Sequence, residues 1–559
     1  MQAQRLDNLQ ECSTNSRLGI DAMCINQRDL DERTIQVTLM GEIFRHSTGN
    51  LIYLGEEEDF VEPALQSIRN IVDEARQDSN NFEDLWDIVY DYKYQDWLWS
   101  STQLKAEIDV SALVSFLSND WFSRLWVIQE TALAPHSTCI YGSHSIELLD
   151  LVRALIWLRH KSAYLPRELT DTAGFFQAAN LWPLTDPQNG CNYRISRYGM
   201  AAMTLFKMQQ DFLASDPKDR VYSLLELARP VPLDDQDAQE THMTGPKEQA
   251  FKTLEGHRPS EAFRKSQPPV IPDYTRSVDE VFRDATKRAI IEGGWGADIM
   301  RYVNHKSEES LGRDRPSWMP VWAERSKMLD GPRLLSDAFV AQNSIKQSDE
   351  EMQLERDPSA VGLRGIIVDE IQAFTSMLDD CSHPNVTTTL QILPWMAEVE
   401  KLAQKTSTSE EALGITLLGG YNRAQQRAGE ADADDRTHLL TYLRERSEAP
   451  PPPFHELDAA TTPEETLGAA RYFDQFRRIC SYRRFFVTER GRIGLGPQVL
   501  RKRDRIVILY GSRVPYVFRK NENGGWFVLG ECYLHGVMYG EAIDAHREGG
   551  EEDVLFTIR

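Results

Sequence analysis

The sequence predicts three structural parts: an N-terminal α/β domain built on a parallel sheet, a mainly helical region and a small C-terminal β-rich module. Two apolar, strand-like runs on either side of an amphipathic helix near the N-terminus are typical of a βαβ unit. Residues 146–483 show mostly helical periodicity, and residues 484–559 contain short β-type runs between turn residues. A chain of 559 residues is also too long for one hydrophobic core, which favours several domains.

The N-terminal domain is predicted to span residues 1–145. Residues 17–25 (RLGIDAMCI) and 50–55 (NLIYLG) are mostly apolar, as buried parallel strands are, and we expect them to be neighbours in the sheet. Apolar residues recur at helical spacing between these two runs, which predicts the crossover helix. A further strand is predicted at 137–142 (STCIYG).

The segment 120–134 (DWFSRLWVIQETALA) is predicted to be an amphipathic helix with an aromatic stripe that ends in a carboxylate. Phe122, Trp126 and Glu130 are spaced four residues apart and would lie along one side of that helix. Glu130 is therefore either an acid in a cleft or a structural residue that is capped or paired with a base. The sequence alone leaves both interpretations open.

Two polar residues accompany the first predicted strand. Asp21 lies within it, and Asn26 follows its carboxyl end. Ligands of open α/β sheets gather at the carboxyl ends of strands, so both residues are candidates for binding. The alternative is that Asp21 caps the backbone or pairs with Arg33.

The middle region, residues 146–483, is predicted to be mainly helical, with one strand at 361–371 (VGLRGIIVDEI). Flexible loops are expected near 231–270, where hydrophobicity is low, and near 429–465, where acidic residues precede a proline run.

The C-terminal module, residues 484–559, is predicted to be a barrel or a curled sheet. The sequence NENGG at 521–525 indicates a hairpin turn, and the glycine-rich GRIGLGP at 491–497 is interpreted as a turn between strands. The predicted β runs are 485–488, 492–495, 505–509, 516–519, 526–530 and 533–534.

Composition excludes several classes of protein. The net charge of −24 repels phosphate backbones, so no nucleic-acid partner is expected. No apolar run is long enough to span a bilayer, and the seven scattered cysteines form no CxxC pair. Cys381 and His383 alone are too few ligands for a metal site, so no metal is expected. These features favour a cytoplasmic protein, and we find no phosphate-binding loop or other common catalytic motif.

Four blocks of sequence carry a resemblance to the heterokaryon-incompatibility (HET) domain proteins of filamentous fungi. The first two are LGIDAMCINQRDLDER at 18–33 with QVTLMGEIF after it, and DWFSRLWVIQETALA at 120–134. SDPKDRVYSLLELA at 215–228, with PDYTRSVDEVFRDAT and PSWMPVW further on, is similar to the segment that usually follows that domain. The runs of the C-terminal module resemble the terminal β module of the same family.

The sequence departs from the pattern of that family at three places. The tyrosine–tryptophan–glycine motif that usually precedes the first block is absent, so we expect the domain to lack its first strand. Gly19 stands where tryptophan is usual, and Arg503 stands where glycine is usual before Asp504.

The resemblance implies a fold and a chemistry. HET domains are similar to Toll/interleukin-1 receptor (TIR) domains, which have a flavodoxin-like sheet, and some TIR domains cleave NAD with a glutamate. The matching position here is Glu130, which would be catalytic. Trp126 would then stack on a base and Arg124 would neutralise the pyrophosphate, while Asp21 and Asn26 line the site. NAD would be a substrate, and no bound cofactor is implied.

The resemblance therefore implies a protein of fungal allorecognition and programmed cell death. Its partners would be other HET or incompatibility proteins, or further copies of the chain in a homo-oligomer. The alternative to NAD cleavage is a non-catalytic HET interaction module or a regulatory scaffold.

Overall fold

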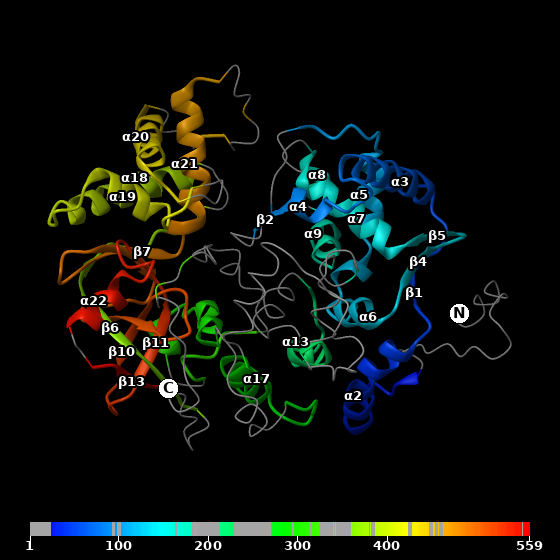
Figure 1. Ribbon diagram of the computed structural model, residues 1–559, viewed down its shortest axis with the longest axis horizontal. Helices are drawn as coiled ribbons and strands as arrows, with labels where there is room; N and C mark the ends of the chain where they lie inside the picture. The colour runs from blue at the N-terminus through cyan, green and yellow to red at the C-terminus, as the bar shows by residue number, and fades with distance from the viewer. Residues whose placement is uncertain are drawn as a thin grey trace.

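A computed structural model of the chain has a small N-terminal sheet with helices, a helical middle and a β-rich C-terminal barrel (Figure 1). The structure describes residues 24–91, 96–97, 102–161, 165–170, 172–181, 185, 212–228, 270–292, 296–311, 315–322, 339, 341, 359–379, 381, 386–422, 427–445, 451–452, 457, 462–549 and 552–559. The N-terminal unit, coloured blue to cyan in Figure 1, and the barrel, coloured orange to red, lie on opposite sides of the molecule.

The N-terminal sheet is mixed, with the strand order β1-β4-β5. β1 (Asn50–Gly55) pairs in parallel with β4 (Ser137–Tyr141), so strands are confirmed at both positions. β5 (His144–Glu147) runs antiparallel to β4, and the prediction of an all-parallel sheet is wrong there. The reason is local: Gly142 has a φ of +58° and turns the chain back within two residues.

The strand predicted at 17–25 lies mostly outside the described residues. Its last two residues are described and are not part of a strand: Cys24 is helical and Ile25 is in a bend. Its expected pairing with β1 therefore stays a prediction.

Helices pack around the N-terminal sheet and supply most of its core. On α3, Leu65, Ile68 and Val72 recur at helical spacing and are buried in the same cluster as residues of α5 and α7. The elements of this unit, besides its three strands, are α2 (Leu30–His46), α3 (Val61–Asp78), α4 (Leu85–Val89), β2 (Tyr90–Asp91), β3 (Asp96–Trp97), α5 (Val110–Leu117), η3 (Asp120–Ser123), α6 (Val127–Leu133), α7 (Leu148–His160), α8 (Arg167–Thr170) and α9 (Ala173–Asn180).

The described part of the middle region is mainly helical. Its elements are α13 (Asp219–Tyr222), α14 (Leu225–Ala228), α17 (Val278–Glu292), η8 (Gly296–Tyr302), η9 (Glu308–Ser310), α18 (Val386–Ala403), α19 (Glu410–Leu417), α20 (Glu430–Glu445) and α21 (Glu464–Cys480). In Figure 1, α18 to α21 form a group beside the barrel, whereas α13 and α17 lie below, between the barrel and the N-terminal unit.

The acidic run that predicted a loop at 429–465 begins a helix instead. The Asp432 carboxylate accepts the Gly429 N–H at 3.0 Å, at the start of α20. Asp435, one turn further, pairs with Nε of Arg471 on α21 at 3.0 Å. Because these acids bind an N–H group and an arginine, the run is compatible with a helix. The other predicted loop, 231–270, lies outside the described residues except for its last residue.

The C-terminal sheet closes on itself. Its strand order is β12-β8-β7-β6-β13-β11-β10-β9, and β6 also pairs with β9, so five strands, β6, β13, β11, β10 and β9, form a ring. Ring closure removes the free edges of these strands. The elements are β6 (Val361–Phe374), β7 (Arg483–Thr488), β8 (Ile493–Pro497), β9 (Arg505–Leu509), β10 (Tyr516–Lys520), β11 (Trp526–Glu531), β12 (Tyr533–Leu534), α22 (Glu541–Gly549) and β13 (Val554–Ile558).

All six predicted C-terminal runs are strands, and the hairpin at 521–525 is confirmed by the Asn521 N–H, which donates to the Gly525 carbonyl oxygen at 2.9 Å. The glycine-rich segment predicted as a turn is instead mostly strand β8. A Cβ on Gly494 would lie 2.5 Å from Cζ of Phe486, so glycine permits the close approach of these strands. α22 and β13 were not predicted from the sequence.

Arg503, which stands where the resembled family has glycine, has a φ of +72°. This left-handed conformation is costly for a residue with a side chain, and glycine adopts it freely. The turn places Asp504 where its carboxylate accepts Nη2–H of Arg519 at 2.7 Å. The glycine of the family pattern therefore has a conformational explanation here.

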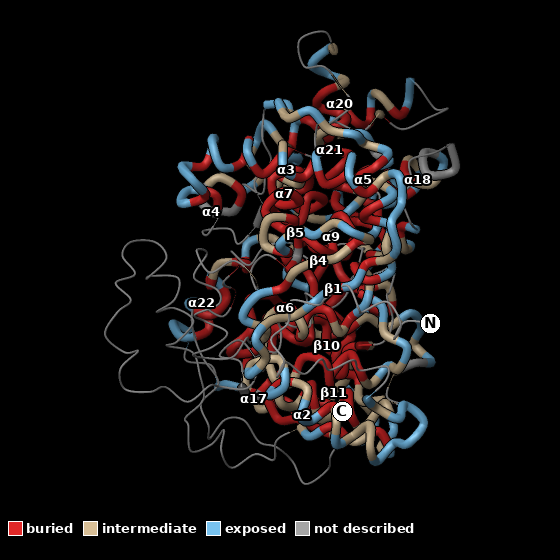
Figure 2. Tube along the Cα trace, turned by 90° about the vertical axis from the view of Figure 1, so that its right-hand side faces the viewer, coloured by how far each residue is buried: buried red, intermediate tan, exposed pale blue. Residues whose placement is uncertain are grey.

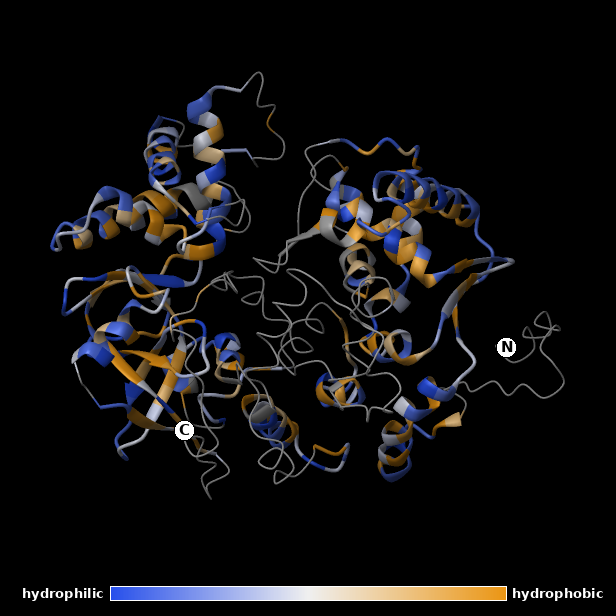
Figure 3. Cartoon of the chain, in the orientation of Figure 1, coloured by the Kyte–Doolittle hydropathy of each residue, from blue (hydrophilic) through white to orange (hydrophobic). Residues whose placement is uncertain are grey.

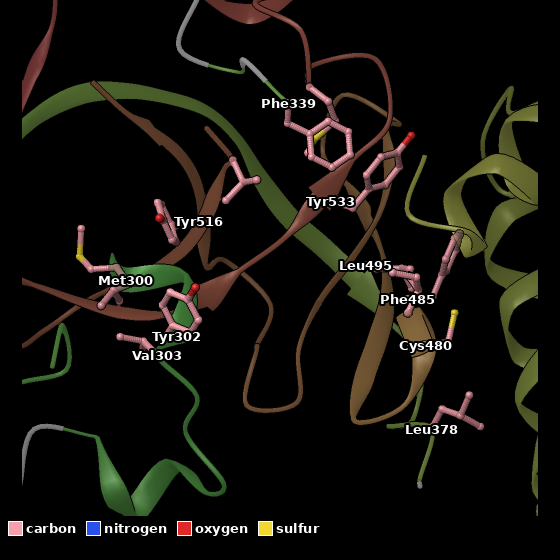
Figure 4. Close-up of a cluster of buried hydrophobic side chains, with 14 of the residues drawn as sticks. Met300, Tyr302, Val303, Phe339, Leu378, Cys480, Phe485, Leu495, Tyr516 and Tyr533 are labelled. Atoms are coloured by element: carbon pink, nitrogen blue, oxygen red, sulfur yellow. The ribbon is translucent and has the colours of Figure 1, made fainter. Parts of the chain in front are cut away.

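Two large cores organise the described residues. One belongs to the N-terminal unit, and the other runs from Val37 on α2 through α17 to the barrel. Figure 2 shows the buried residues in red along the middle of both parts. In the second core, Met300 and Val303 of the middle region lie near Tyr516 of the barrel, and Phe339 lies beside Tyr533 (Figure 4). Among the described residues, no helix is long and apolar enough to cross a membrane.

Candidate functional site

The segment 120–134, predicted as one helix, consists of two helical pieces separated by an extended residue. η3 ends at Ser123, and Arg124 has φ −73° and ψ 132° before α6 begins. The Leu125 N–H donates to the Leu213 carbonyl oxygen at 2.9 Å, and the Leu213 N–H donates to the Ser123 carbonyl oxygen at 2.6 Å. The single-helix prediction is wrong because a distant backbone segment takes bonds that a continuous helix would make internally.

This break separates the residues of the predicted aromatic stripe. Phe122 is buried in the N-terminal core, whereas Trp126, at the start of α6, packs against the other core. Glu130 is half-buried in the first turn of α6, and its N–H donates to the Trp126 carbonyl oxygen at 3.1 Å. Arg124 is exposed. Trp126 and Glu130 therefore stay one helical turn apart, while Phe122 and Arg124 lie outside that helix.

The side chain of Trp126 leads to a buried carboxylate on α13. Its indole N–H donates to Asp219. Nη2 of Arg33, on α2, lies 3.2 and 3.1 Å from the two Asp219 oxygens, and the Tyr274 hydroxyl donates to the same carboxylate. Nη1 of Arg33 contacts Asp216 at 3.3 Å, and the guanidinium stacks 3.7 Å from the Tyr274 ring centre. We call Arg33, Trp126, Asp216, Asp219 and Tyr274 the Asp219 junction.

Burial decides the electrostatics of the Asp219 junction. Asp219 is only 4% exposed, and burial raises the pKa of this carboxyl, while the Tyr274 hydroxyl, Arg33 and the Trp126 N–H oppose the rise. Burial and the neighbouring Asp219 charge raise the pKa of Tyr274 far above its ordinary value. The Tyr274 hydroxyl therefore stays protonated and remains a donor to Asp219.

The residues around Asp219 explain why Tyr274 reaches it. Asp216 accepts the Lys218 N–H at 3.0 Å and forms the turn that starts α13. The Lys218 ammonium donates to the Tyr274 carbonyl oxygen at 2.7 Å, and Tyr222 packs edge-on against Tyr274 with ring centroids 5.1 Å apart. These contacts fix the segment around Tyr274 beside α13.

Further bonds fasten the inner face of α2 to the segment that contains α13 and α14. Nη1 of Arg45 pairs with Glu226 at 2.8 Å. The buried Gln129 amide, in the orientation that satisfies both its atoms, donates to the Ser223 carbonyl oxygen at 2.8 Å and accepts the Gly41 N–H at 3.2 Å. A Cβ on Gly41 would lie 2.4 Å from Cγ of Glu226, so the close contact requires glycine.

Among the described residues, the other predicted site residues are not members of the Asp219 junction. The Asn26 side-chain oxygen accepts the Arg28 N–H at 3.2 Å, and the Asn26 N–H donates to Glu32 at 3.0 Å, so Asn26 shapes the turn before α2. Asp21 lies outside the described residues. Of the four predicted residues that the structure describes, Trp126 alone is a member of the Asp219 junction, and Glu130 lies one turn from Trp126.

Asp219 and Tyr274 were not predicted to belong to a site, and Arg33 was predicted only as an alternative partner of Asp21. The sequence SDPKDRVYSLLELA at 215–228 contains a signal that could have indicated Asp219, because two aspartates there precede an apolar helical run. A carboxylate at that position is either a cap or a buried partner of a distant base, and one sequence does not say which.

The contacts of the Asp219 junction hold separate elements of the chain together. Arg33, Trp126 and Tyr274 all engage the Asp219 carboxylate, which joins α2, α6, α13 and the segment before α17. Among the described residues, no group of three or more His, Cys, Asp and Glu side chains could hold a metal ion.

Comparisons with known proteins place two domains on this chain. The family model of the heterokaryon incompatibility protein (HET) matches residues 3–130, and that of the Het-6 β-barrel domain matches residues 456–553. Heterokaryon incompatibility protein 6, OR allele, of Neurospora crassa is 24% identical over 608 aligned positions, which cover 95% of this chain and 82% of the relative. No solved structure matches.

The HET match includes Arg33, Trp126 and Glu130, whereas Asp219 and Tyr274 lie between the two matched domains. The barrel match covers α21 and most of the C-terminal sheet. The chain is therefore a HET domain protein with a Het-6 β-barrel domain, and a distant homologue of the Neurospora protein.

Proposed function

We propose that the chain acts in fungal heterokaryon incompatibility, as a signalling protein of allorecognition and programmed cell death. The Asp219 junction is the observation that carries this proposal. It joins Arg33 and Trp126 of the HET domain to Asp219 and Tyr274 outside that domain. A change in the HET domain can therefore reach the rest of the chain through one buried cluster. The name of the Neurospora relative, which aligns with nearly the whole chain, supports the same role.

In this proposal the protein signals by contact with other proteins in the cytoplasm, and we call this contact its output. The partners are other HET or incompatibility proteins, or further copies of the chain. The geometry favours this output over catalysis in one respect, because Trp126 already donates its N–H to Asp219 and packs against a core. The indole N–H of Trp126 is thus committed to the internal structure of the protein.

The test is to fuse fungal strains that express the chain with strains that lack it, and to count dying fusion cells by uptake of a vital dye. We expect death in mixed fusions with the wild-type chain and a clear reduction with Arg33→Met, which removes the base of the Asp219 junction. Arg69→Met, at an exposed ion pair, is the matched control and should kill like wild type. Mixed fusions that survive as well as unmixed ones would count against the proposal.

A second candidate function is cleavage of NAD, favoured by the half-buried carboxylate of Glu130 one turn after Trp126. The bond between ribose C1′ and the nicotinamide nitrogen would break, with its electron pair leaving on nicotinamide, and water would add to C1′ with loss of a proton. Glu130 would stabilise the positive charge that develops on the ribose. The ring face of Trp126 and the exposed Arg124 would contact the base and the pyrophosphate.

This candidate is tested by measuring nicotinamide release from NAD by chromatography. We expect turnover by the wild type, loss with Glu130→Gln and normal turnover with Glu58→Gln, an exposed control. Turnover that survives Glu130→Gln would remove Glu130 from the chemistry. A wild-type chain that causes cell death without releasing nicotinamide would leave protein contact as the output.

A further inference from the structure

α2 has its polar attachments on the inside and its apolar stripe on the outside. On the inner side, Val37 and Gly41 are buried, and Arg33 and Arg45 pair with carboxylates of the α13–α14 segment. The Thr34 hydroxyl also accepts the Tyr274 N–H at 3.2 Å. The orientation of the helix about its own axis is therefore fixed from one side.

The outer face carries Ile35, Leu39 and Ile43, which are 59%, 46% and 54% exposed. They follow one another at intervals of four residues and so lie on one side of a helix with about 3.6 residues per turn. Figure 3 shows that α2 carries both hydrophobic and hydrophilic residues. Single exposed apolar residues are normal, but three in register on a helix form a patch that marks an interaction surface.

Acidic residues border this apolar stripe. Asp31 and Glu32 lie four and three residues before Ile35, and Glu42 lies three residues after Leu39, so all three project beside the stripe. Asp31 and Glu42 are exposed, and His46, which contacts Glu42 at 3.5 Å, is the basic side chain at the end of this face. Nη1 of Arg45 lies 2.8 Å from Glu226 on the inner side and 3.3 Å from Glu42, so this one positive charge is shared between two carboxylates. The border is therefore negative.

We propose that the outer face of α2 is a docking surface for a partner helix that has an apolar stripe bordered by lysine and arginine. Three apolar anchors at this spacing fit a helix laid along a helix. The acidic border selects basic residues on the partner. A second copy of the chain fits worse, because a two-fold contact would bring the same acidic border against itself and each copy has a net charge of −24.

This inference rests on the proposed function, in which the output is contact between proteins. To that function it adds the surface that binds the partner, which is the outer face of α2, and the chemistry of the partner helix. The attachment of the inner face to Asp219 also means that a partner bound outside is one helix diameter away from the Asp219 junction.

The probe for this surface is a fluorescent helical peptide with leucine on one face and lysine on the other, titrated against the full chain by fluorescence anisotropy. A leucine–glutamate peptide of equal length is the charge control. We expect binding of the lysine peptide alone and at least about tenfold weaker binding by Leu39→Asp, because one buried leucine of the contact is lost. Leu390→Asp, on α18 and 63% exposed, is the matched control and should bind like wild type.

Three results would overturn the proposal. Binding by Leu39→Asp that is as tight as binding by Leu390→Asp would show that net charge alone binds the peptide. A dimer in analytical ultracentrifugation that Leu39→Asp dissociates would assign the face to a second copy. Peptide binding that appears only after removal of residues 1–23 would assign it to the N-terminal segment of the chain itself. Because peptide binding is measured apart from cell death, failure here is distinguishable from failure of the proposed function.

Discussion

The N-terminal unit and the barrel both bury charged side chains, but they use them for different purposes. In the barrel, Nη2 of Arg483 on β7 pairs with Glu531 on β11 at 2.8 Å, and both side chains are less than 10% exposed. In the Asp219 junction, Arg33 lies within the HET match, and Asp219 lies 186 residues further along the chain, outside that match. Buried pairs in the barrel stabilise one closed sheet, whereas the Asp219 junction couples two parts of the molecule.

The largest effect is expected from a substitution that destabilises the barrel. Glu531 also receives Nε–H of Arg301 at 3.4 Å, so Glu531→Ala leaves two buried arginines without this carboxylate. We expect the free energy of unfolding of the barrel to fall by about 3–5 kcal/mol, measured by urea denaturation. Glu522→Ala, exposed in the hairpin turn, is the control and should change almost nothing. Equal effects of the two substitutions would contradict the buried-pair account.

A smaller effect is expected at the Asp219 junction. Arg33→Met should lower stability by about 2–3 kcal/mol, below the range for fully buried pairs, because the Arg33 side chain is 17% exposed. Amide hydrogen exchange should accelerate in α2 and α13, while the barrel strands keep their protection. Adding Asp219→Asn to Arg33→Met should recover part of the loss, since it removes the uncompensated charge. Acceleration in the barrel as well would show that the two parts unfold together.

The pH dependence of the free energy of unfolding tests whether the Asp219 carboxyl titrates differently in the folded and unfolded states. The folded pKa of Asp219 is raised by burial, so the native state keeps this proton to a higher pH than the unfolded state. Its contribution to stability is complete below the unfolded pKa of about 3.9 and is lost as pH rises through the folded pKa. Asp219→Asn should remove that loss. Urea midpoints of wild type and variant should therefore diverge across this window, and parallel curves would place the titration elsewhere.

The smallest expected effect is a gain. Arg503→Gly relieves the left-handed backbone at φ +72°, which costs a non-glycine residue about 1–2 kcal/mol, while glycine loses about 0.5–1 kcal/mol of unfolded-state entropy. We expect a net stabilisation of up to about 1 kcal/mol in barrel unfolding. Arg490→Gly, in the neighbouring turn, is the control and should not stabilise. A loss of stability with Arg503→Gly would mean that the Arg503 side chain makes contacts worth more than the strain.

The barrel strands could be predicted from sequence because the residue types within each strand and turn are enough to indicate that strand or turn. After Arg505, residues 506–509 form a continuous run of β-branched and apolar residues, and β9 has the predicted bounds. The sequence of 521–525 likewise encodes its own turn. β6 was predicted as a strand, but its central place in the ring depends on partners more than 100 residues away, which periodicity does not report.

The candidate site could be predicted only in part, for the same reason. The pattern of 120–134 favours a helix, and the interruption at Arg124 comes from Leu213, which no local rule includes. Trp126 was singled out from the sequence as a residue that stacks on a base, and that role stays a prediction. Its contact with Asp219 depends on tertiary structure, which the local pattern does not report. NAD chemistry at Glu130 stays a prediction.

The position of β13 in the barrel has a consequence for synthesis of the protein. β6 pairs with β13 along residues 361–365, and β13 is the strand that links β6 to β11 in the ring. The ring therefore cannot close until residue 558 has emerged from the ribosome. A chain whose synthesis stops before β13 would have open strand edges on β6 and β11, which favour aggregation and recognition by chaperones. Barrel closure thus distinguishes chains that contain β13 from chains whose synthesis stopped before it.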